Sequence, residues 1–187
     1  MFQATQIAYW LALSTWFGAV LFIAIAAPII FRTIREADPT LPKVLSVNLE
    51  GQHATLLAGT IVGNLLSVLS KVQLTCAGVL FLSLAAQWFF ISRGGTALVL
   101  AILRTALYMA AAGLVLYDYL VVWPRIQKYR DEYIEHADEP EVANPAKEQF
   151  DRYHTESVSI LRNVLFMLLG MILFSGDIRS ALMIAVQ

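Results

Sequence analysis

Residues 97–123 read ALVLAILRTALYMAAAGLVLYDYLVVW, and this stretch decides the fold. It is apolar over more than the roughly 20 residues that an α-helix needs, at a rise of about 1.5 Å per residue, to cross a hydrocarbon core about 30 Å thick. Three further stretches share this character, namely residues 5–30, 72–91 and 157–175. Because lipid cannot hydrogen-bond a bare backbone, the sequence predicts an all-α polytopic membrane protein with four transmembrane helices in a bundle.

The composition supports a membrane location independently. Of the 187 residues, 58% are apolar and 14% are charged, whereas a soluble domain carries about a quarter charged residues. The mean hydropathy is +0.65. Since four spans use about half of the chain, we expect a single membrane domain over residues 1–187. The lone cysteine, Cys76, is expected to pack as a small buried apolar side chain.

The distribution of Lys and Arg predicts the orientation. Most basic residues follow the first span or lie between the third and fourth, whereas Arg93 and Arg179 alone occupy the other side. The positive-inside rule therefore places residues 32–71 and 124–156 in the cytoplasm and both termini outside it, as in a bacterial inner membrane. Aromatic residues expected at the outer interface are Tyr9, Trp10, Trp88, Phe89 and Phe90, and those expected at the inner interface are Tyr117, Tyr119 and Trp123.

The segment before the second span is also helical in pattern. Residues 55–70 carry no charge, but polar residues are frequent from Gln52 to Lys71. We therefore expect a helix at the inner interface or against the bundle, with a short fifth span as the alternative. Gly59-x-x-x-Gly63 and the small residues 110–113 are candidate surfaces for close helix packing.

Prolines are expected to shape the helices. Pro28 should bend the end of the first span, and Pro124 should bend the third where it continues as a charged cytoplasmic helix over residues 125–134. Asn144 and Pro145 predict the start of a long helix that leads into the fourth span. On that helix the spacing of Phe150, His154 and Ser157 predicts that the last two side chains face the bundle.

Charged side chains near the spans each need a partner, since a charge at the bilayer centre costs at least about 2.5 kcal/mol. Arg104 is expected to snorkel outward or to pair with Asp177, and Asp118 to pair with Lys71 or Arg162. These pairs either fix the helix register or mark a path for a substrate or proton.

Histidines offer the one candidate cofactor site. His53 and His154 lie at similar depth before two spans, which is loosely compatible with haem between helices. No ligand-spacing motif accompanies them, so interfacial hydrogen bonds and no cofactor are expected. The sequence also lacks a glycine-rich phosphate loop and a legible Ser, His and Asp arrangement, and acids balance its basic residues. We therefore expect neither an enzyme nor a nucleic-acid-binding protein.

Several motifs occur together in an informative order: Trp16-Phe17-Gly18, Ala27-Pro28-Ile29-Ile30-Phe31, Leu57-Ala58-Gly59, Trp123-Pro124-Arg125, and Phe150-x-x-x-His154-x-x-Ser157 leading to Asn163. In these motifs the chain resembles the bacterial family of the domain of unknown function numbered 4149, which is similar to eukaryotic transmembrane protein 205. The resemblance implies a four-helix integral membrane protein and brings no established reaction.

Three functions remain open at this stage. The favoured one is a non-enzymatic membrane protein that acts by association, with itself or as an accessory subunit of a larger membrane assembly. The others are a transporter or channel component and a haem-binding redox subunit that uses His53 and His154. Candidate structural or polar-path residues are Pro28, Lys71, Arg104, Asp118, Arg125, Ser157, Arg162, Asn163 and Asp177.

Overall fold

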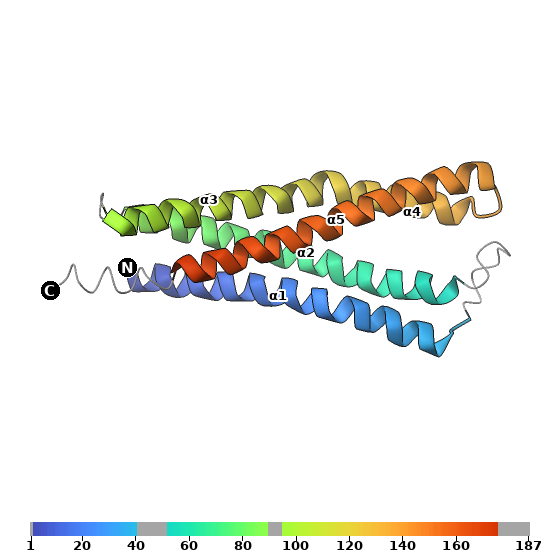
Figure 1. The fold of residues 1–187 in the computed structure, drawn as a ribbon, viewed down its shortest axis with the longest axis horizontal. Coiled ribbons are helices and arrows are strands. Elements are labelled where there is room, and N and C mark those ends of the chain that lie inside the picture. The colour runs from blue at the N-terminus through green and yellow to red at the C-terminus, as the bar shows by residue number, and fades with distance from the viewer. Residues whose placement is uncertain (1, 41–51, 90–94, 176–187) are drawn as a thin grey trace. The chain divides into compact units, whose positions relative to one another are not determined.

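The computed structural model describes residues 2–40, 52–89 and 95–175, and this part of the chain is helical without strands. The elements are α1 (Phe2–Ala37), α2 (His53–Trp88), α3 (Gly95–Tyr117), the π-helical turn η2 (Asp118–Val122), α4 (Trp123–Glu135) and α5 (Pro140–Ser175) (Figure 1). Lys43, Phe90, Arg93, Asp177 and Arg179 lie outside the described residues, and the expectations that involve them stay predictions.

Four helices in the described ranges are long and apolar enough to cross a membrane, as predicted. They are α1, α2, α5 and the continuous run from Leu98 to Glu135 that joins α3, η2 and α4. Their outward faces carry large apolar side chains, which include Leu11, Phe22, Leu82, Phe166 and Leu173 with exposed fractions of 61–69%. Exposing such apolar side chains to lipid costs no free energy, whereas exposing them to water does.

The interface helix expected before the second span is the first half of α2, which runs unbroken from His53 to Trp88. Its sequence contains no proline, and its hydroxyl side chains bond back to the preceding turn, as Ser70 Oγ does to the Leu66 carbonyl at 2.9 Å. Nothing in the helix therefore forces a break. At about 1.5 Å per residue, 36 residues exceed a hydrocarbon core about 30 Å thick, so one end of α2 extends beyond it.

The predicted interruption near Pro124 takes the form of the π-helical turn η2. The Trp123 N–H bonds to the Asp118 carbonyl, five residues back, and Pro124 occupies the first turn of α4. Because proline has no N–H and its ring clashes with the carbonyl four residues earlier, widening the preceding turn accommodates it. The charged helix expected beyond this point is confirmed as α4.

Two helix ends differ in their chemistry. α1 stays helical through Pro28 and ends before Asp38, whose φ of 42° is left-handed and which precedes Pro39. Aspartate tolerates this region, and a following proline disfavours the helical one.

α5 begins at Pro140, so the prediction that Asn144 caps it is wrong: the Ala143 N–H already bonds the Glu139 carbonyl at 2.9 Å. Proline suits a first helical position because no N–H is needed there.

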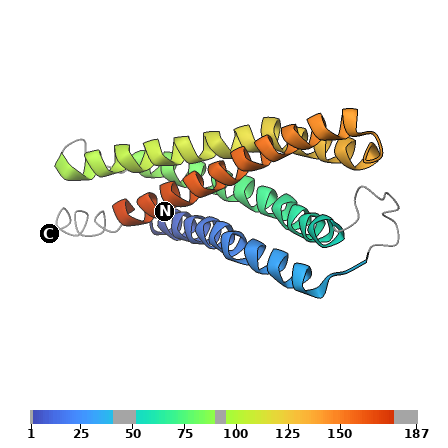
Figure 2. The same ribbon diagram turned by 45° about the vertical axis from the view of Figure 1, so that its right-hand side comes forward.

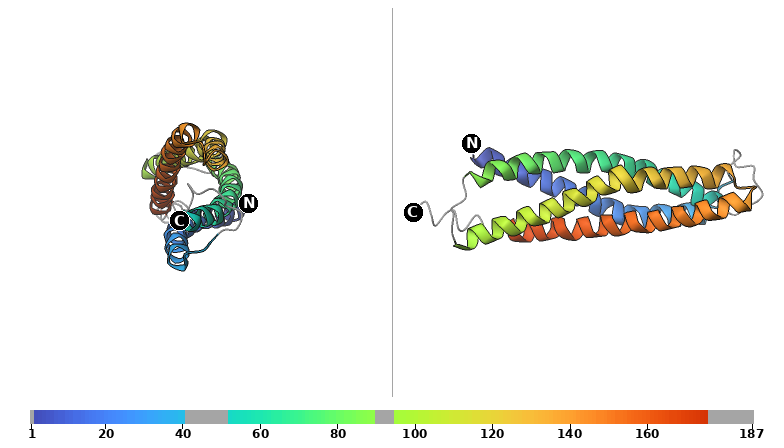
Figure 3. Two further views of the ribbon diagram at one scale, coloured as in Figure 1. Left: turned by 90° about the vertical axis from the view of Figure 1, so that its right-hand side faces the viewer. Right: turned by 90° about the horizontal axis from the view of Figure 1, so that it is seen from above.

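The chain divides into two compact units. Unit 1 comprises Met1–Val20, Lys71–Leu116 and Ile160–Gln187, and unit 2 comprises Leu21–Ser70 and Tyr117–Ser159. Within unit 1 the end of α5 lies beside the start of α1 (Figure 2). Within unit 2 the first part of α5 runs alongside α4 (Figure 3).

The cores of the two units use different side chains. Large residues fill the core of unit 1, among them Leu13, Trp16, Leu80, Leu168 and Met171. Cys76 is buried there as predicted. Small residues line the core of unit 2, where Ala58, Ala143 and Ala146 are buried together with Val122 and Ile126.

Candidate functional site

A buried arginine is the most unusual polar residue of unit 1. Arg104 on α3 is 2% exposed. Its Nη2 donates to Gln87 Oε1 on α2 at 2.8 Å, and its guanidinium carbon lies 4.9 Å from the centroid of the Tyr9 ring on α1. The prediction that Arg104 snorkels outward is therefore wrong, because an aromatic face and an amide meet it inside the unit. Its predicted partner Asp177 is outside the described residues.

A hydrogen-bond chain extends this group to α5. The hydroxyl of Tyr9, whose ring lies against the guanidinium, is 2.7 Å from Ser175 Oγ. The Ser175 hydroxyl donates its single proton to the Met171 carbonyl, so Tyr9 is the donor to Ser175. Tyr9 is fully buried, and its assignment to the outer aromatic belt is wrong. We call Tyr9, Gln87, Arg104 and Ser175 the arginine cluster.

Two donors of the arginine cluster have no hydrogen-bond partner among the described residues. They are Arg104 Nε and Gln87 Nε2, and both nitrogens are buried. The described groups against the guanidinium are the Tyr9 ring and hydroxyl and the Gln87 amide, none of which is negatively charged at neutral pH. Buried polar groups are nearly always paired in native proteins, so two adjacent orphan donors beside a buried cation require an explanation.

Two other buried polar side chains of unit 1 donate to partners on neighbouring helices. Trp16 Nε1 donates to Gln73 Oε1 at 3.0 Å between α1 and α2, and the Tyr108 hydroxyl donates to the Ala77 carbonyl at 2.9 Å. Gln73 and Gln87 lie on the same buried face of α2 as Leu80, fourteen residues apart. A spacing of two heptads places two residues on one face of a helix, so the sequence alone could have indicated that both glutamines share the buried face. Tyr9 and Ser175 carry no comparable signal, since each is one polar residue near the end of a long helix.

Unit 2 places a half-buried carboxylate on the π-helical turn. Asp118 Oδ1 is buried and has no hydrogen-bond partner within the described ranges. Next to it the Tyr117 hydroxyl donates to Glu156 Oε1 at 2.9 Å. The predicted partners of Asp118, Lys71 and Arg162, are exposed residues of unit 1, and pairing with either stays a prediction.

Polar contacts tie α4 and α5 together in unit 2. Arg125 Nη1 donates to the Tyr153 hydroxyl at 2.9 Å, and its guanidinium lies 5.2 Å from the centroid of that ring. Tyr153 stacks on Tyr129 with ring centroids 5.8 Å apart. Arg125 thus acts as a bridge between helices, which is a structural role.

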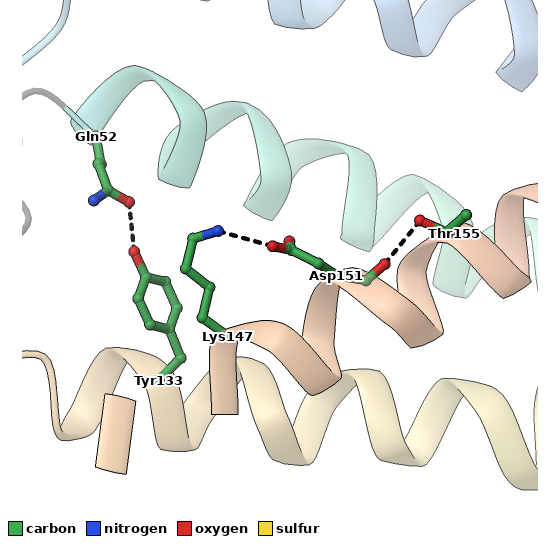
Figure 4. Close-up of polar contacts among 5 residues, drawn as sticks. All are labelled: Gln52, Tyr133, Lys147, Asp151 and Thr155. Carbon is green, nitrogen blue, oxygen red and sulfur yellow. Dashed lines mark hydrogen bonds and ion pairs between the residues drawn. The ribbon is translucent and has the colours of Figure 1, made fainter. Parts of the chain in front are cut away.

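Figure 4 shows the far end of the same helix pair. Tyr133 on α4 donates a hydrogen bond to Gln52, and Lys147 donates to Asp151 on α5 at 2.8 Å. The hydrogen bond to Asp151 raises the pKa of Lys147, which lies outside the predicted span. This exposed pair spans one helical turn and contributes little to stability.

The two candidate haem ligands differ in exposure. His53 is half-buried at the start of α2, whereas His154 is exposed and stacks on Phe150 with ring centroids 5.7 Å apart. The prediction that His154 faces the bundle is therefore wrong. The buried face of α5 is offset from it and carries Ile160, Val164, Leu168 and Met171, while Ser157 is half-buried and Asn163 is exposed. Within the described ranges no three His, Cys, Asp or Glu side chains are arranged to hold a metal ion.

Four long apolar helices, outward apolar faces and polar groups gathered inside define a multi-pass helical membrane protein. Residues 11–135 match the family model described as Domain of unknown function (DUF4149). The chain therefore belongs to this family, as its motifs predicted. No curated protein and no solved structure matches it.

Proposed function

We propose that this small integral membrane protein acts by association in the bilayer, as a self-associating bundle or as an accessory subunit of a larger membrane assembly. The observation that carries the proposal is the open space around its helical glycines. A Cβ built on Gly18, Gly59, Gly63, Gly78 or Gly113 meets nothing within 4 Å. Glycine costs a helix up to about 1 kcal/mol relative to alanine, and no packing among the described residues requires it at these positions.

Contact with a helix of another chain would explain why glycine occurs at these positions. Glycines in membrane helices let two backbones approach closely, and Gly59 and Gly63 have the four-residue spacing of such a surface. Exposed polar side chains support the same conclusion. Asn163 is exposed on α5, close to Phe166, which is 63% exposed. An amide on a lipid-facing surface is costly, whereas against another chain it finds a hydrogen bond.

A transporter or channel component is the second candidate. The unpaired Asp118 Oδ1 beside the π-helical turn favours it, because intramembrane carboxylates and π-helical turns are both frequent at functional sites. Four spans would line a pathway only in an oligomer, so this function also needs association.

The haem alternative is weaker, since an exposed His154 does not match an inward imidazole. A visible spectrum of purified protein without a Soret band would dismiss it.

The location proposed with this function is a bacterial inner membrane, with both termini outside the cytoplasm. The excess of Lys and Arg in residues 32–71 and 124–156 supports the orientation. Likeness to eukaryotic transmembrane protein 205 stays a prediction that rests on the motifs alone.

The proposal is tested by purification from native membranes in mild detergent. We expect wild-type protein to migrate as an oligomer or together with other membrane subunits. A Gly59→Leu, Gly63→Leu double variant should shift to the monomer, because two bulky side chains hold a neighbouring helix away. Ala85→Leu adds bulk at an exposed position of the same helix and should leave the association unchanged. A wild-type protein that is monomeric and free of partners would contradict the proposal.

A further inference from the structure

The orphan donors of the arginine cluster point to a missing acceptor. Gln87 and Arg104 are 1% and 2% exposed, so water outside the protein does not satisfy them. Their first hydrogen bond joins Arg104 Nη2 to Gln87 Oε1 and leaves Arg104 Nε and Gln87 Nε2 without partners in the part of the chain that the structure describes, residues 2–40, 52–89 and 95–175. Both remaining groups are donors, and they belong to two side chains that are already bonded to each other. One acceptor with two oxygens matches this arrangement.

The charge of the cluster selects the kind of acceptor. The Tyr9 ring offers its electron-rich face to the guanidinium at 4.9 Å but brings no negative charge. A neutral acceptor would complete the hydrogen bonds and leave a cation buried. An oxyanion completes the hydrogen bonds and also neutralises the buried charge. Guanidinium groups bind phosphate and carboxylate oxygens with strong charge-assisted hydrogen bonds.

The place of the cluster along the helices favours phosphate. Ser175 is the last residue of α5, Gln87 precedes the last residue of α2, and Tyr9 and Arg104 each lie within the first three turns of their helices. All four therefore belong to the same end of unit 1. Phosphate groups of lipids lie at the ends of membrane helices, just outside the hydrocarbon core.

We propose that Arg104 and Gln87 bind a phosphate-type oxyanion at this end of unit 1. Arg104 Nε and Gln87 Nε2 are the donors, and the guanidinium rests against the Tyr9 ring, whose hydroxyl is held by Ser175. Neither donor nitrogen is open to solvent, so binding of the anion requires a side chain around the cluster to move. The same chemistry is offered by the headgroup of an anionic lipid and by free phosphate. This site is independent of the glycine surfaces proposed for association.

The test is thermal unfolding of the full chain in an uncharged detergent. Phosphatidylglycerol, phosphatidylcholine and inorganic phosphate are added separately at constant ionic strength. We expect Tm of the wild type to rise with phosphatidylglycerol, with inorganic phosphate or with both. A rise with phosphatidylglycerol alone assigns the site to a lipid headgroup, and a rise with inorganic phosphate assigns it to a free anion. No rise with phosphatidylglycerol or inorganic phosphate would overturn the proposal, and so would a rise with phosphatidylcholine that equals or exceeds both.

Two variants connect the response to the cluster. Gln87→Glu has nearly the same shape and supplies a carboxylate to Arg104 from within the chain. Its Tm without anion should equal or exceed that of the wild type, and its apparent affinity for the anion should fall about tenfold or more, since a charge-assisted hydrogen bond is lost. Arg104→Gln should abolish the response if it folds. Arg32→Gln removes an exposed cation of unit 2 and should respond like the wild type. A Gln87→Glu protein with an unchanged anion response would refute the site.

Discussion

Arg104 shows how a single residue escapes prediction. Hydropathy correctly marks it as an exception within an apolar span, and a long cationic side chain is then expected to reach the interface. The structure instead holds it at 2% exposure, because Tyr9, Gln87 and Ser175 come to it from three other helices. Such partners are far apart in sequence, and no local pattern connects them. The need for a partner was predictable, whereas its identity depends on helix packing.

The hydrogen bond between Trp16 and Gln73 makes a direct prediction. Trp16→Phe should lower the free energy of unfolding by about 1–3 kcal/mol, because it leaves Gln73 Oε1 buried without its donor and the smaller ring fills less of the core. Trp10 is the matched control, since it lies on the same helix but is 36% exposed. Trp10→Phe should cost clearly less. Equal losses in detergent-based unfolding would show that the buried hydrogen bond contributes nothing.

The sequence predicts a helix correctly wherever an apolar stretch is long enough to cross the membrane. All four spans appear at or near the expected residues, because a chain in lipid must pair its own backbone groups. Errors arose where a helix continues or begins for subtler reasons. The polar residues around Lys71 suggested a break in α2, but no proline enforces one. Pro124 was correctly marked as an irregularity, although the π-helical turn before it depends on a backbone adjustment that residue types do not specify.

Glycines in the helices provide an element-scale prediction within unit 1. A Cβ on Gly170 would lie 3.0 Å from Leu107 Cδ1, whereas a Cβ on Gly78 meets nothing within 4 Å. Gly170→Ala should therefore give a less stable protein than Gly78→Ala, by about 1–3 kcal/mol, because the Leu107 side chain must shift. Gly78→Ala should be neutral or stabilising by up to about 1 kcal/mol through helix propensity. Thermal unfolding of monomeric protein measures both, and the opposite ranking would contradict the packing of α3 against α5.

At the scale of the whole molecule, lipid explains the composition, the outward apolar faces and the inward polar groups together. Side chains such as Leu82 and Leu173, more than two-thirds exposed, are ordinary in a hydrocarbon environment. The family description names no reaction, so the proposed function rests on open glycine surfaces and on a buried arginine that meets no acidic side chain among the described residues. The proposed orientation rests on the Lys and Arg of the connecting segments alone.

The most direct test of the membrane topology is cysteine labelling in intact cells. In a Cys76→Ser background, single cysteines replace Phe89 just after α2 and Glu139 just before α5, both of which are exposed. One crossing separates them, so an impermeant maleimide should label Phe89→Cys in intact cells and Glu139→Cys only after the membrane is permeabilised. Labelling of both positions from outside would contradict the four-span topology, and labelling of Glu139→Cys alone would contradict its orientation.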